Sequence, residues 1–295
     1  VRIYEYSNSS WTQLGSDIDG EAASDFSGTS VSMNSAGDRV AIGATDNDGT
    51  ASDAGHVRIY EYSNSSWTQL GSDIDGEAAN DWSGTSVSMN SAGDRVAIGA
   101  LFNGGTGTDA GHVRIYEYSN SSWTQLGSDI DGEAANDRSS YSVSMNSAGD
   151  RVAIGARRND GTASDAGHVR IYEYSNSSWT QLGSDIDGEA ASDFSGNSVS
   201  MNSAGDRVAI GAPYNAGTGS NAGHVRIYEY SNSSWTQLGS DIDGEAAGDR
   251  SGNSVSMNSA GDRVAIGAWF NDDAGNSAGH VRIYEYSNSS WTQLG

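Results

Sequence analysis

Carboxylates recur at fixed spacing along this chain, so metal binding is the first chemistry to consider. The segment Asp17-Ile18-Asp19-Gly20-Glu21 returns in every copy of a repeat, with the spacing of half a calcium-binding loop. The further spaced carboxylate and the distal bidentate Glu of a full loop are absent. We therefore expect no cofactor and no metal, and the segment is interpreted as an Asp-Gly turn with solvated charge. If calcium does bind, the candidates are Asp17, Asp19 and Glu21.

One histidine stands in each repeat, always directly after a glycine, at His56, His112, His168, His224 and His280. A ring of histidines can hold a metal, but one per repeat places neighbours a repeat width apart, which favours a hydrogen-bonded structural role. Ser, His and Asp are all abundant, yet a catalytic site needs one asymmetric constellation. Because most positions are identical in all copies, we predict no catalytic residue and expect that the protein is not an enzyme.

Aromatic and arginine residues occupy the few positions at which the copies differ. The repeat is 56 residues long, and its variable positions all fall in two segments, residues 24–29 and 45–53 of the first copy. Aromatic and Arg side chains contribute most strongly to interfaces. The predicted ligand-binding residues are therefore Phe26, Trp82, Arg138, Phe194, Arg250, Phe102, Arg157, Arg158, Tyr214, Trp269 and Phe270.

The elements that carry these residues have the periodicity of strands. Alternation of apolar and polar residues predicts strands over 30–34, 39–44, 56–62 and 67–71, and at 56-residue steps from these. No amphipathic stripe is long enough for a helix. Four short antiparallel strands per repeat are typical of a β-propeller blade. The fold class is thus an all-β propeller with a half-blade hairpin over 1–15 and five blades over 16–71, 72–127, 128–183, 184–239 and 240–295.

The strand order assigns both variable segments to one face. If the first strand of a blade runs down and the second returns, the linker over 24–29 and the loop over 45–53 emerge together. The turns at 34–38 and 63–66 emerge on the opposite face and never vary. We name the face that carries residues 24–29 and 45–53 the variable loop face. We expect it to bind a glycan or a protein, because binding residues concentrate on loops of rigid scaffolds.

The blade resembles a known family. Phe26-Ser27-Gly28-Thr29-Ser30-Val31, then Val40-Ala41-Ile42-Gly43-Ala44, then Gly55-His56-Val57-Arg58-Ile59-Tyr60 are similar to the FG-GAP repeat of integrin α-subunit propellers and bacterial surface proteins. The fourth copy keeps Ile210-Gly211-Ala212-Pro213. The resemblance implies a propeller whose loop face is the ligand side. The family's calcium loop between the first two strands is replaced by a tight turn at 34–38, and Arg138 and Arg250 interrupt the Phe column.

Composition limits the partners and the location. Asp plus Glu number 39 against 15 basic residues, and the net charge of −24 argues against nucleic acid and anionic membranes. There is no cysteine, and no apolar run approaches the roughly 20 residues of a membrane span. The chain begins in mid-repeat, which suggests a processed or excised segment. Together with the resemblance, these features favour an extracellular or cell-surface location.

Two functions remain at this stage. The first is a noncatalytic extracellular adhesion module that presents its variable loop face to a ligand. The alternative is a structural subunit of a surface filament, because the hairpin over 1–15 has no inner strands before it and an unpaired strand edge is a template for another chain. Head-to-tail self-association is therefore also expected.

Overall fold

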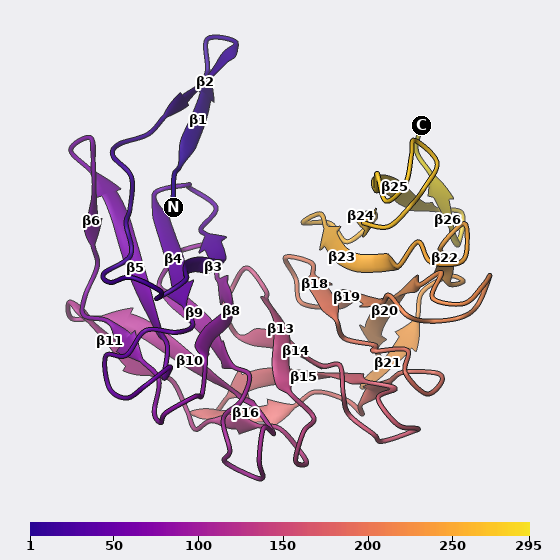
Figure 1. The fold of residues 1–295 in the computed structure, drawn as a ribbon, viewed down its shortest axis with the longest axis horizontal. Coiled ribbons are helices and arrows are strands. Elements are labelled where there is room, and N and C mark those ends of the chain that lie inside the picture. Colours follow the sequence, from indigo (N-terminus) through magenta and orange to yellow (C-terminus); the bar gives the residue numbers. More distant parts are fainter.

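The computed structural model describes all 295 residues and contains only β-strands and connecting turns and loops. The strands form a two-stranded hairpin and five sheets arranged in an arc (Figure 1). The predicted all-β propeller with four-stranded antiparallel blades is confirmed. No helix in the structure is long and apolar enough to cross a membrane.

The strands follow the 56-residue repeat. The N-terminal hairpin consists of β1 (Tyr4–Ser7) and β2 (Ser10–Gln13). Blade 1 consists of β3 (Ser27–Met33), β4 (Arg39–Ala44), β5 (His56–Ser63), β6 (Ser66–Gln69) and β7 (Ile74–Asp75). Blade 2 consists of β8 (Ser83–Met89), β9 (Arg95–Ala100), β10 (His112–Ser119), β11 (Ser122–Gln125) and β12 (Ile130–Asp131). Blade 3 consists of β13 (Ser139–Met145), β14 (Arg151–Ala156), β15 (His168–Ser175), β16 (Ser178–Gln181) and β17 (Ile186–Asp187). Blade 4 consists of β18 (Ser198–Met201), β19 (Arg207–Ala212), β20 (His224–Ser231), β21 (Ser234–Gln237) and β22 (Ile242–Asp243). Blade 5 consists of β23 (Ser251–Met257), β24 (Arg263–Ala268), β25 (His280–Ser287) and β26 (Ser290–Gln293).

Within a blade, neighbouring strands in the sequence pair with each other. In blade 1 the order is β3-β4-β5-β6, all antiparallel, and β7 pairs with the start of β5, where His56 lies opposite Asp75. The first strand begins at Ser27, earlier than predicted, because a bulge between Ser27 and Ser30 lets it continue its pairing with β4. The blade boundaries expected from the sequence, which fall in the linkers between sheets, stay a prediction.

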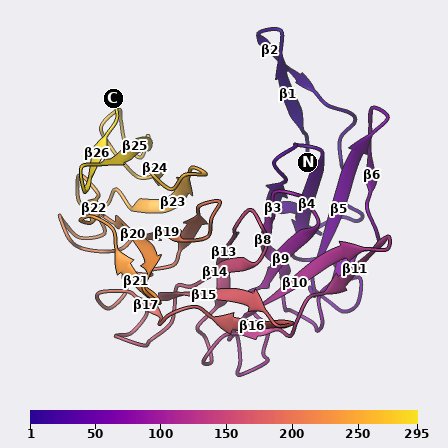
Figure 2. The ribbon, with the colours of Figure 1, turned by 180° about the vertical axis from the view of Figure 1, so that it is seen from behind.

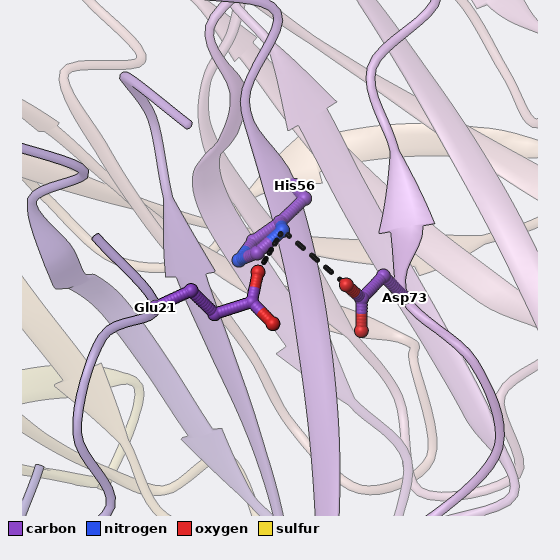
Figure 3. A group of neighbouring side chains, drawn as sticks. All are labelled: Glu21, His56 and Asp73. Carbon is purple, nitrogen blue, oxygen red and sulfur yellow. Dashed lines mark ion pairs between the residues drawn. The ribbon is translucent and has the colours of Figure 1, made fainter. Parts of the chain in front are cut away.

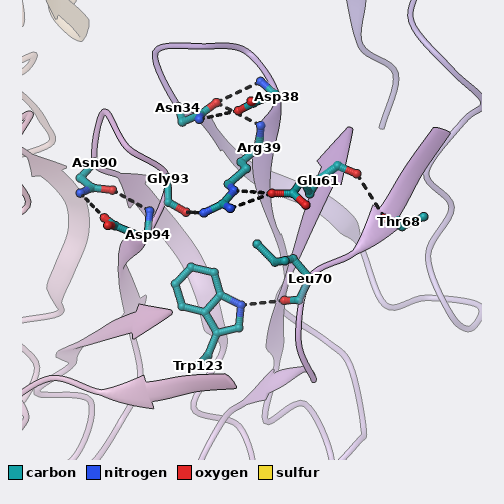
Figure 4. Close-up of polar contacts among 10 residues, drawn as sticks. All are labelled: Asn34, Asp38, Arg39, Glu61, Thr68, Leu70, Asn90, Gly93, Asp94 and Trp123. Carbon is teal, nitrogen blue, oxygen red and sulfur yellow. Dashed lines mark hydrogen bonds and ion pairs between the residues drawn. The ribbon is translucent and has the colours of Figure 1, made fainter. Parts of the chain in front are cut away.

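The invariant turns have local causes. The Asn34 side chain accepts hydrogen bonds from the backbone N–H of Asp38 and of Arg39, and Gly37 adopts a φ of 73° that suits glycine (Figure 4). Between β5 and β6, Asn64 and Ser65 have φ values of 50° and 65°, as a two-residue hairpin turn requires. These contacts fix the strand register without help from other blades.

The core lies between the blades. Ala41, Val57 and Ile59 of blade 1 pack against Val87 and Ile98 of blade 2, and all five side chains are buried. Small residues are required in these layers, because a Cβ on Gly43 would lie 2.1 Å from the carbonyl oxygen of Gly84 in the next blade. One blade therefore buries its apolar face only when the next blade is in place.

Polar contacts also join successive blades. Arg39 donates to Glu61 of its own blade and to the carbonyl of Gly93 in the turn of the next blade, while the Trp123 indole donates to the Leu70 carbonyl (Figure 4). The same bonds recur along the arc. They set the position of one blade relative to its neighbour.

The first strands of the blades lie on the inner side of the arc. Met and Ser residues from the ends of all five of these strands, such as Met33, Met89 and Met145, line one shared cavity of about 140 Å³. The N-terminal hairpin and blade 5 lie at opposite ends of the arc, as both views show (Figures 1 and 2). The hairpin packs its Ile3 against Val40 and Ile42 of blade 1.

Candidate functional site

Each blade carries a cluster of one histidine and two carboxylates. In blade 1, the Nδ1 atom of His56 lies 3.8 Å from Oε2 of Glu21 and 3.8 Å from Oδ2 of Asp73 (Figure 3). The three ligand atoms lie within 4.8 Å of one another. A nitrogen and two carboxylate oxygens that converge in this way have the chemistry of a divalent-cation site.

Three different segments bring the cluster together. His56 is the first residue of β5 and is held by strand pairing with Ala44 on one side and Asp75 on the other. Glu21 comes from the linker before β3, and Asp73 from the linker after β6. The cluster therefore needs the linkers on both sides of one blade.

A buried arginine orients the glutamate. Arg58 donates to the carbonyl oxygen of Asp19 at 2.8 Å, and its Nη1 lies 3.5 Å from Oε1 of Glu21. The other carboxylate oxygen of Glu21 faces His56. Two carboxylates and one guanidinium leave the cluster with one net negative charge, which favours a cation over an anion.

Burial disfavours the charged form of the histidines in the clusters of blades 1 to 4. Burial lowers the pKa of His56, His112 and His224 against the opposing effect of the nearby carboxylates, and it lowers that of His168 from 6.5 to about 4. The expected hydrogen-bonded structural role is wrong for His56, whose two ring nitrogens are buried without a hydrogen-bond partner. A neutral imidazole with a free nitrogen is the form that binds metal.

Burial also affects one carboxylate of a cluster, Glu133, and one beside a cluster, Asp187. It raises the pKa of Glu133 and of Asp187, while Arg170 and Arg226 respectively oppose the change.

The same cluster recurs as Glu77–His112–Asp129, Glu133–His168–Asp185 and Glu189–His224–Asp241. In blade 5 the cluster is Glu245–Asp273–His280, and its histidine is more exposed, at 23%.

Among the clusters of blades 1 to 4, that of blade 4 differs because its two carboxylates line a large cavity, and in blade 5 His280 lines a separate cavity of about 390 Å³. The blade 4 cavity has a volume of about 500 Å³, within the range of about 300 to 1,000 Å³ typical of ligand pockets. Glu189 and Asp241 of the cluster line it together with Asp193, Tyr214 and Asp243. Its walls are the linkers and the loop that form the variable loop face.

The predicted metal candidates are brought into the clusters only in part. Glu21 is a member of the blade 1 cluster, and Asp73, which repeats Asp17 one unit later, is another. Asp17 itself accepts hydrogen bonds from Gln13 and Arg2, which lower its pKa. Asp19 takes part only through its backbone oxygen, which accepts a hydrogen bond from Arg58. The sequence did not show that two linkers and a strand start would meet, because that depends on how blades pack.

Most of the predicted ligand-binding residues contact one another in pairs. Trp82 packs edge-on against Phe102, Phe194 against Tyr214, and Trp269 against Phe270, with ring centroids 4.7 to 5.0 Å apart. Residues from the two variable segments thus form a nearly continuous aromatic and arginine belt. Whether this belt binds a ligand stays a prediction.

Arginines join the belt from blade to blade. Arg138 lies over Phe102, Arg157 lies 3.7 Å from the ring centroid of Tyr141, and Arg250 lies over Tyr214 and Phe270. Arg158 makes no such contact, and its Nε is buried without a hydrogen-bond partner. Phe26 stands apart at 64% exposure. Tyr141, which sequence reasoning missed, is also a variable residue, so the signal was present.

Comparisons with known proteins show the fold. No family model matches the chain, and no curated protein does. The chain is similar to the solved structure of a periplasmic gluconolactonase of Pseudomonas aeruginosa, at 10% identity and a TM-score of 0.64. The match covers 100% of this chain and 77% of that one. The propeller of repeated four-stranded blades is thereby supported, while no sequence family supports the FG-GAP repeat in particular.

Two expectations about function are corrected by this comparison. The noncatalytic adhesion module, with the filament subunit as its alternative, and the expectation that the protein is not an enzyme are both contradicted, because the solved structure that shares the fold is an enzyme. The clusters add groups compatible with catalysis that the argument from identical repeats excluded. Identical residues in different blades also have different surroundings: of the four like clusters in blades 1 to 4, only that of blade 4 has residues that line a cavity. The expectation of no catalytic residue stays a prediction.

Proposed function

We propose that this protein is a divalent-cation-dependent hydrolase that opens a neutral cyclic ester of a sugar acid at the Glu189–His224–Asp241 cluster. The observation that carries the proposal is a pair of carboxylates that line a cavity of about 500 Å³ and face a buried, uncharged imidazole behind them. The reaction class is supported by the gluconolactonase that shares the fold. That support is an analogy of fold.

The spacing of the cluster suits a cation. Nδ1 of His224 lies 3.8 Å from Glu189 and 3.9 Å from Asp241. Ligands about 2.3 Å from a cation lie roughly 3.3 to 3.8 Å apart at angles of about 90° to 110°. Three protein ligands leave positions free for water and substrate. A divalent cation there would supply Lewis acidity to the substrate carbonyl and would lower the pKa of a water molecule.

The charge of the cavity selects the substrate. Glu189, Asp193, Asp241 and Asp243 line it, so an anionic substrate is repelled and a neutral one is admitted. Tyr214 offers a ring face for a sugar and a hydroxyl for hydrogen bonding. In the reaction, water adds to the carbonyl carbon, the bond to the ring oxygen breaks, and that oxygen takes up a proton. The hydroxy acid produced is an anion, and the same carboxylates favour its release.

The experiment measures acid release from glucono-lactone at constant pH. The full chain is first treated with a chelator and then titrated with Mn²⁺, Zn²⁺ or Ca²⁺. We expect hydrolysis above the spontaneous rate only with cation present. Glu189→Gln should lower the cation-dependent rate by roughly 100-fold, because a carboxylate that handles charge in the transition state is worth at least that much.

A matched control exists within the chain. Glu77→Gln changes the same residue of an identical cluster in blade 2, which lines none of the cavities. The activity of this variant should equal that of the wild type. Hydrolysis that survives the chelator, or that falls equally in both variants, would rule out the blade 4 cluster as the site.

Two finer expectations from the sequence belong to this proposal. Kinship with FG-GAP repeats is supported by motifs such as Ile210-Gly211-Ala212-Pro213. Export from the cytoplasm, and beyond it an extracellular or cell-surface location, is supported by the periplasmic location of the gluconolactonase.

A further inference from the structure

Three arginines gather at one end of blade 3, in the middle of the arc. Arg138 directly precedes β13, and Arg157 and Arg158 directly follow β14 (Figure 1). Ser139 of β13 lies opposite Ala156 of β14, so the two segments that carry the arginines are neighbours. The backbone N–H of Arg158 also donates to the carbonyl of the residue before Arg138. We call these three residues the arginine cluster.

Arg138 and Arg158 occupy positions whose side chains contact each other in blades 2, 4 and 5. In blades 2 and 4 these positions hold two rings with centroids 4.7 and 5.0 Å apart, and in blade 5 an arginine lies 4.6 Å from a ring centroid. The pairs are Trp82–Phe102, Phe194–Tyr214 and Arg250–Phe270. Blade 3 alone has two arginines there, so the fold brings two like charges to the positions of a contact pair.

No carboxylate neutralises the arginine cluster. Every arginine outside the variable segments forms an ion pair with an aspartate or a glutamate. Arg138, Arg157 and Arg158 form none, although the chain has 39 acidic residues. Asp137, next to Arg138 in the sequence, is buried, and its carboxylate accepts from a backbone N–H and from the Asn159 amide. The chain therefore supplies no counter-charge at this place.

Most hydrogen-bond donors of the cluster have no acceptor in the chain. The Nε atoms of all three arginines are buried without a hydrogen-bond partner. The one hydrogen bond from these side chains runs from Nη1 of Arg157 to Oδ1 of Asn197, at 3.2 Å. Arg138 and Arg157 also lie over aromatic rings, but such contacts use the face of a guanidinium group and leave its N–H edge for an acceptor.

The charges of the cluster act on one another. Burial lowers the pKa of Arg157, Tyr141 opposes this change, and the positive charges of Arg158 and Arg138 lower the pKa further. An anion among these groups would replace repulsion by attraction. The net charge of −24 acts against anions mainly from a distance, and exposed charges more than about 8 Å away are largely screened at physiological ionic strength.

We propose that the arginine cluster binds a tetrahedral oxyanion with two negative charges, a phosphate or a sulfate group. Such a group has enough oxygens to accept from all three guanidinium groups, whereas a carboxylate has two oxygens that a single arginine can already engage. The cluster lines none of the five cavities, so the group binds at the loop surface. This site is distinct from the Glu189–His224–Asp241 cluster and needs no cation.

Isothermal titration calorimetry of the full chain tests this site. Bound cations are first removed with a chelator, and the chelator by gel filtration, so that the histidine–carboxylate clusters cannot hold phosphate through a metal. Inorganic phosphate and sulfate should each bind saturably at one site per chain, and acetate at least about tenfold more weakly.

Glucose 6-phosphate, titrated in parallel, distinguishes two sources of the oxyanion. Tighter binding than that of inorganic phosphate would support a site for a phosphate carried by an organic molecule. Equal binding of the two would support a site for the free oxyanion. Absence of saturable binding by phosphate, sulfate and glucose 6-phosphate would overturn the proposal.

Two substitutions borrowed from other blades test the residues of the cluster. Arg158→Phe recreates the arginine–ring pair of blade 5, and Arg157→Leu introduces the residue that blade 2 has at that position. Both are therefore compatible with the fold of a blade, which the melting temperature checks. Each should weaken phosphate binding by about tenfold or more, because hydrogen bonds between charged groups are lost.

The matched control is Arg250→Phe, which introduces the residue that blade 4 has at that position. It removes the same charge from the same face, but Arg250 contacts rings and not other arginines. Phosphate binding should stay within about twofold of the wild type, since a distant exposed charge is screened. Equal weakening by all three substitutions would overturn the proposal, because the charge of the whole face would then account for binding.

Discussion

At the residue scale, position in the arc decides what a repeated side chain does. The Trp67 indole donates to the Leu14 carbonyl and is 9% exposed, whereas Trp11, in the same sequence, is 68% exposed. The histidines are buried in blades 1 to 4 and partly exposed in blade 5. Burial therefore gives each copy its own contribution to stability.

The buried histidines predict a loss of stability in mild acid. Burial holds the pKa of His168 at about 4, against 6.5 when unfolded, so between these values the unfolded chain binds the extra proton. Its stabilising contribution is complete above pH 6.5 and is lost as the pH falls toward 4. The difference corresponds to roughly 3 kcal/mol of unfolding free energy.

Urea unfolding in the presence of a chelator, between pH 7.5 and pH 4.5, measures this dependence. His168→Gln should reduce the decline in unfolding free energy between pH 7.5 and pH 4.5. The loss of unfolding free energy that it causes at pH 7.5 should be smaller than this reduction. A decline of the same steepness in the variant and the wild type would show that His168 does not carry the effect.

The candidate site was predictable from the sequence only at single residues. Glu21 and its copies were identified as metal candidates because they are acidic and regularly spaced. Their partner Asp73 lies in the linker after the blade, and their partner His56 was interpreted as structural. A sequence pattern reports neighbours along the chain, whereas this cluster depends on contacts across 35 and 52 residues, from Glu21 to His56 and to Asp73.

At the element scale, the strands were predictable because their period of two is strong and the repeat confirms each one several times. The structure agrees for β4 (Arg39–Ala44) and extends β5 by one residue to Ser63. The two-residue β7 was missed, since Ile74 and Asp75 have too short a pattern to be recognised. β7 pairs with His56 and Val57, the part of β5 that β6 leaves unpaired.

The fourth strand of a blade is attached to the preceding blade through its tryptophan. Trp179 donates to the Leu126 carbonyl at 2.7 Å, and its ring packs into the core between blades 2 and 3. Trp179→Phe removes this donor and leaves the carbonyl without its partner. We expect a loss of about 1 to 2 kcal/mol in unfolding free energy, measured by urea titration.

The matched control is Trp11→Phe on β2, where the indole is exposed and makes no such bond. It should change stability by less than about 0.5 kcal/mol. If both substitutions cost the same, the bond between the blades would not be the cause.

At the scale of the whole molecule, stability is distributed along a line of nearest neighbours. Each core cluster joins two adjacent units, as with Ala153 and Val169 of blade 3 against Val208 and Ile210 of blade 4. Interior blades therefore have two stabilising interfaces, and blade 5 has one. In such an array the ends open more readily than the middle.

Hydrogen exchange should reveal this difference between identical strands. β15 and β25 have the same sequence, and each pairs with a strand on both sides. Two things differ: β17 also pairs with His168 and Val169 of β15, while β25 has no such partner, and the packing is unequal. Val169 and Ile171 are fully buried, while Val281 and Ile283 are 66% and 46% exposed. Because local opening is easier where fewer apolar contacts must break, β25 amides should exchange faster.

Peptides that include the variable loop distinguish the copies by mass, so residues 157–175 and 269–287 can be followed separately. We expect at least about tenfold slower exchange in the first, which corresponds to roughly 1.4 kcal/mol of extra opening free energy. Equal exchange would mean either that the arc unfolds as one cooperative unit or that another chain covers Val281 and Ile283. Dilution separates these two outcomes, since only contact with another chain makes the protection of β25 depend on protein concentration.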